Sequence, residues 1–259
     1  YTLRTLFPYT TLFRSGVMWI STIFLLFNAS FLVTLAKLGD MFGRKKLFLI
    51  SLFVFTISSV LCGISPSLLI LIISRAVQGI ASAGLMTIAI PIALGMFSKE
   101  KSGMIAGAWG SSMALAMAIG PSLGGFITEK INWRCIFYIN IPLAIISYIL
   151  VTMFVAKDEM SIKNKKIDFG GILFLSISLF CLTYALLEGN NYGFRSIKIL
   201  TLFATAIVST IVLLIIENTN KNALFDFSLF KIRSFTVSSV TLAFVGVVYA
   251  VRSEEHTSE

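Results

Sequence analysis

The amino-acid sequence predicts an all-α fold, a polytopic transmembrane helical bundle with about eight spans. Of its 259 residues, 57% are hydrophobic and 13% are charged, whereas soluble domains carry about a quarter charged residues. The formal net charge is +9. A nucleic-acid partner would require the basic residues to share one face, but they lie in short gaps between long apolar runs. The expected partner is therefore a lipid bilayer, and no nucleic acid is expected to bind.

Both ends of the chain are expected to be foreign to the natural protein. Residues 5–15 (TLFPYTTLFRS) are what a common short-read sequencing adapter gives on translation, and residues 252–259 (RSEEHTSE) are what its partner adapter gives. We therefore expect residues 1–15 and 252–259 to be adapter-derived artefacts, and the remainder to be an internal piece of a longer gene.

About eight apolar segments reach the length that a membrane-spanning helix needs, roughly 20 residues. The last of them is short and carries several Ser and Thr residues. Pro91 is expected to kink the long third span near its end, because proline removes a backbone hydrogen bond. The expected spans are residues 17–36, 47–64, 68–90, 104–127, 135–156, 169–187, 198–216 and 235–251.

The Lys and Arg residues between the spans predict the orientation of the chain, because cytoplasmic loops are enriched in basic residues. The loop at 37–46 is placed in the cytoplasm. The loops on that side then hold most of the bases, namely Lys37, Arg44, Lys45, Lys46, Lys99, Lys101, Lys157, Lys163, Lys165, Lys166, Lys221, Lys231 and Arg233. The opposite loops hold Lys130, Arg134, Arg195 and Lys198.

Neither a metal site nor a disulfide is expected, and no bound cofactor is implied. Cys62, Cys135 and Cys181 lie in different spans or at a span edge, without the CxxC spacing of metal or redox sites. The one histidine, His256, lies in the adapter-derived end.

The stretch LGDMFGRKK, residues 38–46, predicts a tight reversal between two antiparallel spans. Gly39 and Gly43 permit close backbone approach and a positive φ. Asp40 can pair with a nearby base or lie at a helix N-terminus, where negative charge is favoured. The alternative is a plain cytoplasmic loop, which explains the bases but not an acid between two glycines.

Arg75 is the one charge within a well-defined span, in the string RAVQG. A charge at the bilayer centre costs about 2.5–3.5 kcal/mol on insertion scales, so it is expected to face a cavity or a partner. A polar-to-small helical face follows it, at Gln78, Gly79, Ser82 and Met86. The alternative is that Arg75 extends to the lipid headgroups.

The stretch GAWGSSMALAMAIGPSLGG places small residues at intervals of four, a spacing that lets membrane helices touch backbones. Pro121 is expected to bend this span. Generic small-residue packing is the alternative interpretation. The rows of small residues are Gly103, Gly107 and Ser111, then Gly110, Ala114 and Ala118, then Gly120 and Gly124.

These stretches together resemble the signature motifs of the major facilitator superfamily. The RAVQG string resembles the R-x-x-Q-G signature of its proton-coupled exporters, and Gly120 to Gly125 resembles the G-P-x-x-G-G signature of its antiporters. WRCIFYINIP (133–142) and EGNNYGF (188–194) resemble its fourteen-span drug:proton antiporters. The loop signature G-x-L-A-D-R-x-G-R-[RK]-x-x-L is matched at Leu38, Asp40, Gly43, Arg44, Lys45 and Leu47, with Met41 in place of the usual base.

The resemblance implies that the chain holds spans two to nine of that family. Residues 16–156 would form the N-terminal transporter half without its first span. Residues 157–216 would form a cytoplasmic linker plus two extra central spans. Residues 217–251 would begin the C-terminal half.

The resemblance further implies a proton-coupled antiporter in the cell membrane, monomeric and driven by the proton gradient. It would export drugs or amphipathic and cationic small molecules by alternating access. Arg75, Gln78 and Gly79 would serve proton coupling at the cavity. The conformational latch would be Asp40, Gly43, Arg44 and Lys45, and the hinge and packing residues would be Gly120, Pro121, Gly124 and Gly125.

Three other functions are considered. A uniporter or symporter of the same superfamily is disfavoured by the antiporter-type ending at Gly120 to Gly125. An intramembrane enzyme would need ionisable or nucleophilic groups converging within the spans, where only Arg75 is charged. A membrane scaffold or sensor would be expected to carry a soluble domain, and the loop at about 157–168 is too short to hold one.

Overall fold

The computed structural model describes residues 11–156, 169–219, 232–233 and 236–241. Their regular structure is helical, which confirms the all-α prediction. The elements are α2 (Thr11–Phe42), α3 (Arg44–Ile64), α4 (Leu68–Met96), the 3-10 helix η1 (Lys99–Lys101), α5 (Ser102–Lys130), α6 (Cys135–Tyr138), α7 (Asn140–Phe154), α8 (Phe169–Tyr192) and α9 (Ile197–Thr219).

Seven helical segments in the described residues are long and apolar enough to cross a membrane, and they coincide with the first seven predicted spans. The eighth predicted span, 235–251, lies mostly outside the described residues, as does the linker at 157–168. Large apolar side chains cover the outside of the helices, such as Phe53, Met153 and Ile197. Since water would disfavour so much exposed apolar surface, the chain is a multi-pass membrane protein.

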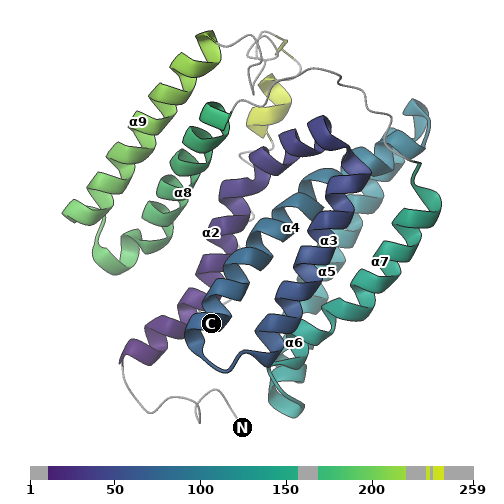
Figure 1. Ribbon diagram of the computed structural model, residues 1–259, viewed down its shortest axis with the longest axis horizontal. Helices are drawn as coiled ribbons and strands as arrows, with labels where there is room; N and C mark the ends of the chain where they lie inside the picture. Colours follow the sequence, from purple (N-terminus) through teal and green to yellow (C-terminus); the bar gives the residue numbers. More distant parts are fainter. Residues whose placement is uncertain (1–10, 157–168, 220–231, 234–235, 242–259) are drawn as a thin grey trace.

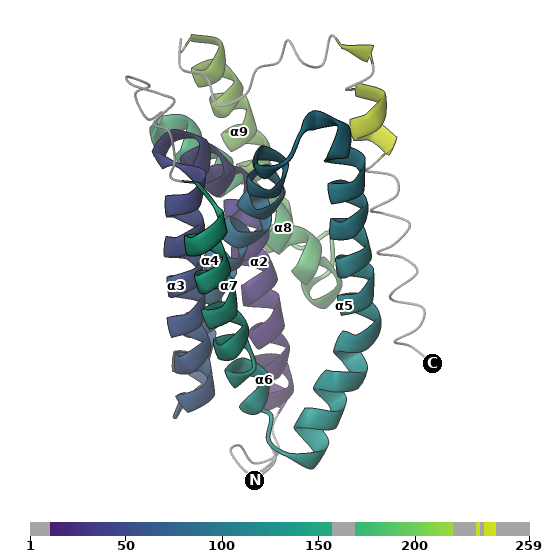
Figure 2. The same cartoon turned by 90° about the vertical axis from the view of Figure 1, so that its right-hand side faces the viewer.

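The helices form one row with α5 to the side (Figures 1 and 2). Helix α8 pairs with α9 and also packs against α2, and α2 packs against α4. Helix α3 packs against α4 and against α6 and α7. Helix α5 contacts α4, α6 and η1, and Figure 2 shows its lower part bending toward α6. Both Pro91 and Pro121 lie inside helices that continue past them.

The reversal between the first two described spans is tighter than predicted. Helix α2 continues to Phe42, beyond the predicted end at residue 36, and α3 begins at Arg44. The one residue between them, Gly43, has φ 104° and ψ 130°, a region that glycine adopts without steric cost. The predicted positive φ is confirmed at Gly43. The prediction of a loop across 37–46 is wrong, because Lys and Arg are good helix formers and do not by themselves end a helix.

The orientation of the spans can be tested by labelling single cysteines in the full-length protein. Ser98 lies between α4 and η1, and Asn132 lies between α5 and α6. A membrane-impermeant maleimide should label Asn132→Cys in intact cells, and should label Ser98→Cys only after the cells are made permeable. The protein with its native cysteines alone gives the background. Labelling of Ser98→Cys from outside would contradict the orientation.

Candidate functional site

Arg75 is the one charged residue of α4, and its guanidinium contacts groups inside the bundle. Its Nε donates to the carbonyl oxygen of Ile20 on α2 at 3.1 Å, and its Nη1 donates to Oε1 of Gln78 at 2.8 Å. The guanidinium carbon lies 4.2 Å from the ring centre of Phe24 and 5.7 Å from that of Phe137, which is cation–π geometry. These contacts favour a partner inside the bundle over extension to the lipid headgroups.

Gln78 joins Arg75 to two further helices. Its side chain is 1% exposed, and its Nε2 donates to Oγ of Ser59 on α3, which is also fully buried. The same Oγ accepts a hydrogen bond from Nδ2 of Asn140, the first residue of α7, at 3.1 Å. The thiol of Cys62 lies 3.9 Å from Oε1 of Gln78. Because buried polar groups need partners, this network ties α3, α4 and α7 together.

Gly79 lies at a close crossing of α2 and α4. A Cβ at this position would overlap the carbonyl oxygen of Phe24 and lie 3.2 Å from the backbone nitrogen of Asn28. Nδ2 of Asn28 lies 3.4 Å from the carbonyl oxygen of Gly79 and 4.0 Å from Sδ of Met86. The polar-to-small face of α4 therefore meets α2, which contributes an amide side chain at mid-span.

Sequence reasoning found the α4 residues of this site and missed their partners on other helices. An amide in an apolar span is a signal that could have found Asn28, and Asn140 stands in the WRCIFYINIP string. Ser59 could not be singled out, because it is one of several serines in α3. Ile20 makes its contact through its backbone carbonyl, which the residue type does not reveal. The missed partners are Ile20, Phe24, Asn28, Ser59 and Asn140.

The charge cluster that the sequence places in the cytoplasm is built around Gly43. Nη2 and Nε of Arg44 lie 2.8 and 2.9 Å from Oδ1 of Asp40, so the expected pairing of Asp40 with a nearby base is found. Both side chains are about half exposed, and such a pair contributes about 0–1 kcal/mol. Gly39 fits closely against α4, since a Cβ there would lie 3.1 Å from Cδ1 of Ile88.

Lys45 connects the start of α3 to the end of α7. Its Nζ donates to the carbonyl oxygen of Thr152 at 3.2 Å and also to that of Val155. The last carbonyls of a helix lack partners within that helix and carry its negative dipole end. Lys45 therefore acts as a side-chain cap for α7.

Replacement of this lysine should loosen the end of α7. We expect Lys45→Ala to lower the free energy of unfolding of the full-length protein by about 1 kcal/mol, the scale of a partly exposed charged hydrogen bond. The measurement is thermal unfolding in detergent, with Lys101→Ala as a matched control on exposed η1. Equal unfolding midpoints for the two variants would show that the cap contributes nothing.

The glycines of the predicted hinge do not pack against another helix among the described residues. A Cβ added at Gly120, Gly124 or Gly125 would meet nothing within 4 Å, and the same holds for Gly103, Gly107 and Gly110. The described chain thus places these small residues on an open face of α5. Their packing role, and that of Pro121, stays a prediction.

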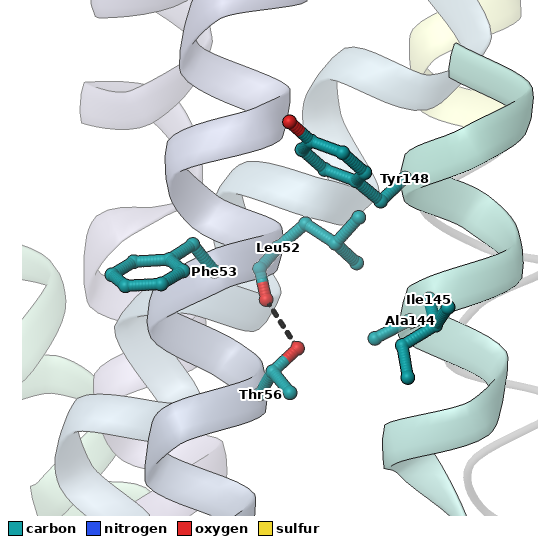
Figure 3. Close-up of a pocket in the computed structure, with 6 residues that line it drawn as sticks. All are labelled: Leu52, Phe53, Thr56, Ala144, Ile145 and Tyr148. Atoms are coloured by element: carbon teal, nitrogen blue, oxygen red, sulfur yellow. Dashed lines mark hydrogen bonds between the residues drawn. The ribbon is translucent and has the colours of Figure 1, made fainter. Parts of the chain in front are cut away.

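An apolar cavity of about 190 Å³ lies between α3 and α7 (Figure 3). The Thr56 hydroxyl bonds to the carbonyl oxygen of Leu52 in its own helix at 2.7 Å, so that group is already satisfied. The cavity offers apolar surface and no charged group, and it is separate from the Arg75 network. It is lined by Leu52, Phe53, Thr56, Ala144, Ile145 and Tyr148.

Named relatives of this chain are bacterial transport and resistance proteins. It is 36% identical over 228 residues to "Multidrug resistance protein 3" of Bacillus subtilis, covering 88% of this chain and 44% of the relative. It is 34% identical over 232 residues to "Multidrug export protein EmrB" of Haemophilus influenzae, covering 89% and 46%. It is 33% identical over 226 residues to "Riboflavin transporter RibZ" of Clostridioides difficile, covering 87% and 48%.

The chain spans about half the length of the relatives that it matches. The sequence profile of the Major Facilitator Superfamily matches residues 3–253, which is nearly the whole chain. The structure agrees with the motifs that carry the resemblance. The loop signature lies at the turn around Gly43, and the arginine of the R-x-x-Q-G string lies within the membrane-spanning helix α4. The chain belongs to the Major Facilitator Superfamily.

Proposed function

We propose that this chain is part of a proton-coupled antiporter that exports amphipathic or cationic small molecules from the cell by alternating access. The complete transporter, meaning the full-length protein that contains these spans, would act as a monomer in the cell membrane, with the Gly43 turn in the cytoplasm. Substrate would bind near the midplane between two helical halves that rock against each other. The proton gradient would supply the energy, without a cofactor or a metal.

The arginine within α4 is the observation that carries this proposal. A charge within a span is costly and marks ion or proton pathways, and the Arg75 guanidinium donates to two acceptors, on Ile20 and Gln78, and stacks on the ring of Phe24. The names of two relatives, "Multidrug resistance protein 3" and "Multidrug export protein EmrB", support export of drugs. Gln78 and Gly79 would complete the coupling site by holding Arg75 and α2 in place.

The remaining predicted residues would control the transition between the two conformations. Asp40, Arg44 and Lys45 would bias the equilibrium as a cytoplasmic latch around Gly43, because they pair the ends of α2, α3 and α7. The open glycine face of α5 would pack against helices of the complete transporter, with Pro121 and the three glycines of the G-P-x-x-G-G stretch as its hinge, namely Gly120, Gly124 and Gly125.

The test is ethidium efflux from cells that lack their own efflux pumps and express the complete transporter. We expect preloaded ethidium to leave faster than from cells with an empty vector, and we expect a protonophore to remove the difference. Efflux that continues at the same rate after the proton gradient has collapsed would refute proton coupling. A parallel assay measures riboflavin transport, because one relative is named a riboflavin transporter. Transport of riboflavin without ethidium would indicate a narrow substrate range, and transport of both would indicate a broad one.

A symporter or uniporter of the same superfamily is the alternative within transport. A symporter would move protons in the same direction as its substrate, and a uniporter would move no protons. An enzyme is disfavoured because the chain belongs to a transporter superfamily and its named relatives are transport and resistance proteins. A scaffold does not account for a buried arginine network.

A further inference from the structure

We propose that Ser59 and Asn140 are positioning residues that hold the Gln78 amide, and through it the Arg75 guanidinium, in the orientation that proton coupling requires. This inference rests on the proposed antiport function. It assigns a role to two residues on α3 and α7, neither of which was identified as a site residue from the sequence.

The direction of the hydrogen bonds shows why Ser59 matters. A guanidinium has donors and no acceptor, so Gln78 must turn its Oε1 toward Arg75, as it does at 2.8 Å. The amide nitrogen of Gln78 then points the other way and needs an acceptor. At 1% exposure the Gln78 side chain is closed to bulk water, and Oγ of Ser59 is the acceptor that the structure supplies. Without that acceptor, this orientation would leave a buried amide N–H unpaired, at a cost of about 1–3 kcal/mol.

Asn140 fixes the serine in turn. Its Nδ2 donates to the same Ser59 oxygen at 3.1 Å, so that oxygen accepts from two amides and its own proton must point elsewhere. One helical turn beyond Ser59, the junction between α6 and α7 packs closely against α3. A Cβ at Gly63 would overlap the ring of Tyr138. The position of Asn140 is therefore set by helix packing, and it transmits that position to Gln78.

The burial of Ser59 separates this role from substrate binding. Its side chain is 0% exposed, so it cannot touch a drug molecule in a cavity. Loss of its hydroxyl should therefore leave drug binding intact and affect the step that depends on the orientation of Arg75. Proton-driven transport should therefore fall, whereas proton-independent exchange of the substrate should not.

The experiment uses the complete transporter in proteoliposomes with ethidium as the probe. Ethidium accumulation driven by a pH gradient is compared with exchange of ethidium for ethidium at equal pH on both sides. The variants are Ser59→Ala and Asn140→Ala, with Ser59→Thr as the conservative variant that keeps the hydroxyl. Thr56→Val is the matched control on α3, because it removes a hydroxyl bonded only within its own helix, to the carbonyl oxygen of Leu52.

We expect the two alanine variants to lose about tenfold in gradient-driven accumulation, the scale of one buried hydrogen bond. Their exchange rate and half-saturating ethidium concentration should stay within about twofold of wild type, as should both activities of Ser59→Thr and Thr56→Val. Equal losses of accumulation and exchange in Ser59→Ala and Asn140→Ala would indicate a general structural role and overturn the inference. So would full accumulation in both variants.

A second measurement decides the inference if the wild-type protein fails to respond to the pH gradient, which would refute the proposed function itself. Thermal unfolding is measured for Gln78→Ala, Asn140→Ala and the double variant. A connected network predicts that the double variant loses less in melting temperature than the two single losses added together. Additive losses would show that Asn140 does not act through Gln78.

Discussion

Arg75→Ala in the complete transporter is expected to lower proton-driven ethidium efflux by about a hundredfold. The substitution removes the one charge of α4 and the hydrogen bonds that its guanidinium donates to the Ile20 carbonyl and to Oε1 of Gln78. A hydrogen bond to a charged group contributes about 1.5–3 kcal/mol, and about 1.4 kcal/mol corresponds to a factor of ten in rate. The measurement is the efflux rate at matched surface expression, since removing a charge from a span should not hinder membrane insertion.

Arg75→Lys serves as the control that separates coupling from a simple charge requirement. Lysine keeps the positive charge but lacks the planar set of donors, so it cannot reproduce the two bonds to Ile20 and Gln78 together with the stacking on Phe24. We expect partial efflux at best. Wild-type rates in Arg75→Ala would end the coupling hypothesis, and full activity in Arg75→Lys would favour an arginine that only extends to the headgroups.

Gly79→Ala is expected to destabilise the transporter by about 1–3 kcal/mol, the usual cost of overpacking a well-packed contact. The added methyl group would overlap the Phe24 carbonyl oxygen, which belongs to backbone and cannot move aside alone. Helix α2 must therefore shift away from α4. That shift also displaces the Ile20 carbonyl that accepts from Arg75, so efflux should fall together with stability.

Gly95→Ala provides the comparison on the same helix, because a Cβ at Gly95 meets nothing within 4 Å. Its melting temperature should equal or exceed that of the wild type, since alanine favours helix over glycine by about 1 kcal/mol. Thermal unfolding in detergent measures both variants. If Gly79→Ala melts no lower than Gly95→Ala, α2 and α4 are not in close contact at this point.

The sequence was sufficient to predict features that depend on neighbours along one helix. Hydropathy located the first seven spans. Arg75 and Gln78 stand three residues apart, which places their side chains on one helical face, and they are in contact. Asp40 and Arg44 lie on either side of the Gly43 turn, and the expected pairing of this acid with a nearby base is also found. The positive φ at Gly43 was also predictable from the local residue type.

Contacts between helices could not be predicted in the same way. Ser59, Asn140 and the Ile20 carbonyl meet the Arg75 and Gln78 side chains only because α2, α3 and α7 pack around α4 in a particular rotation. Periodicity shows which residues share a face, but it does not show which faces meet. In membrane helices this choice is set by packing detail and interhelical hydrogen bonds.

The glycines at residues 38–46 and the glycines of α5 show what residue spacing can and cannot predict. Spacing alone predicted close approach for Gly39 and for the glycines of α5. Gly39 has Ile88 against it, whereas Gly120 and Gly124 have no neighbour among the described residues. A row of small residues permits contact without identifying the partner.

The most direct test of proton antiport is the direction of proton movement when drug moves down its own gradient. The complete transporter is reconstituted in proteoliposomes that contain a pH-sensitive dye, with the membrane potential clamped by potassium and valinomycin. Ethidium, a permanently charged cation, is then added outside. Antiport predicts that protons leave as ethidium enters, so the internal pH rises, and that Arg75→Ala shows no such rise. A fall in internal pH with the wild-type protein would identify a symporter, and an unchanged internal pH during ethidium entry would identify a uniporter; either result would contradict the account.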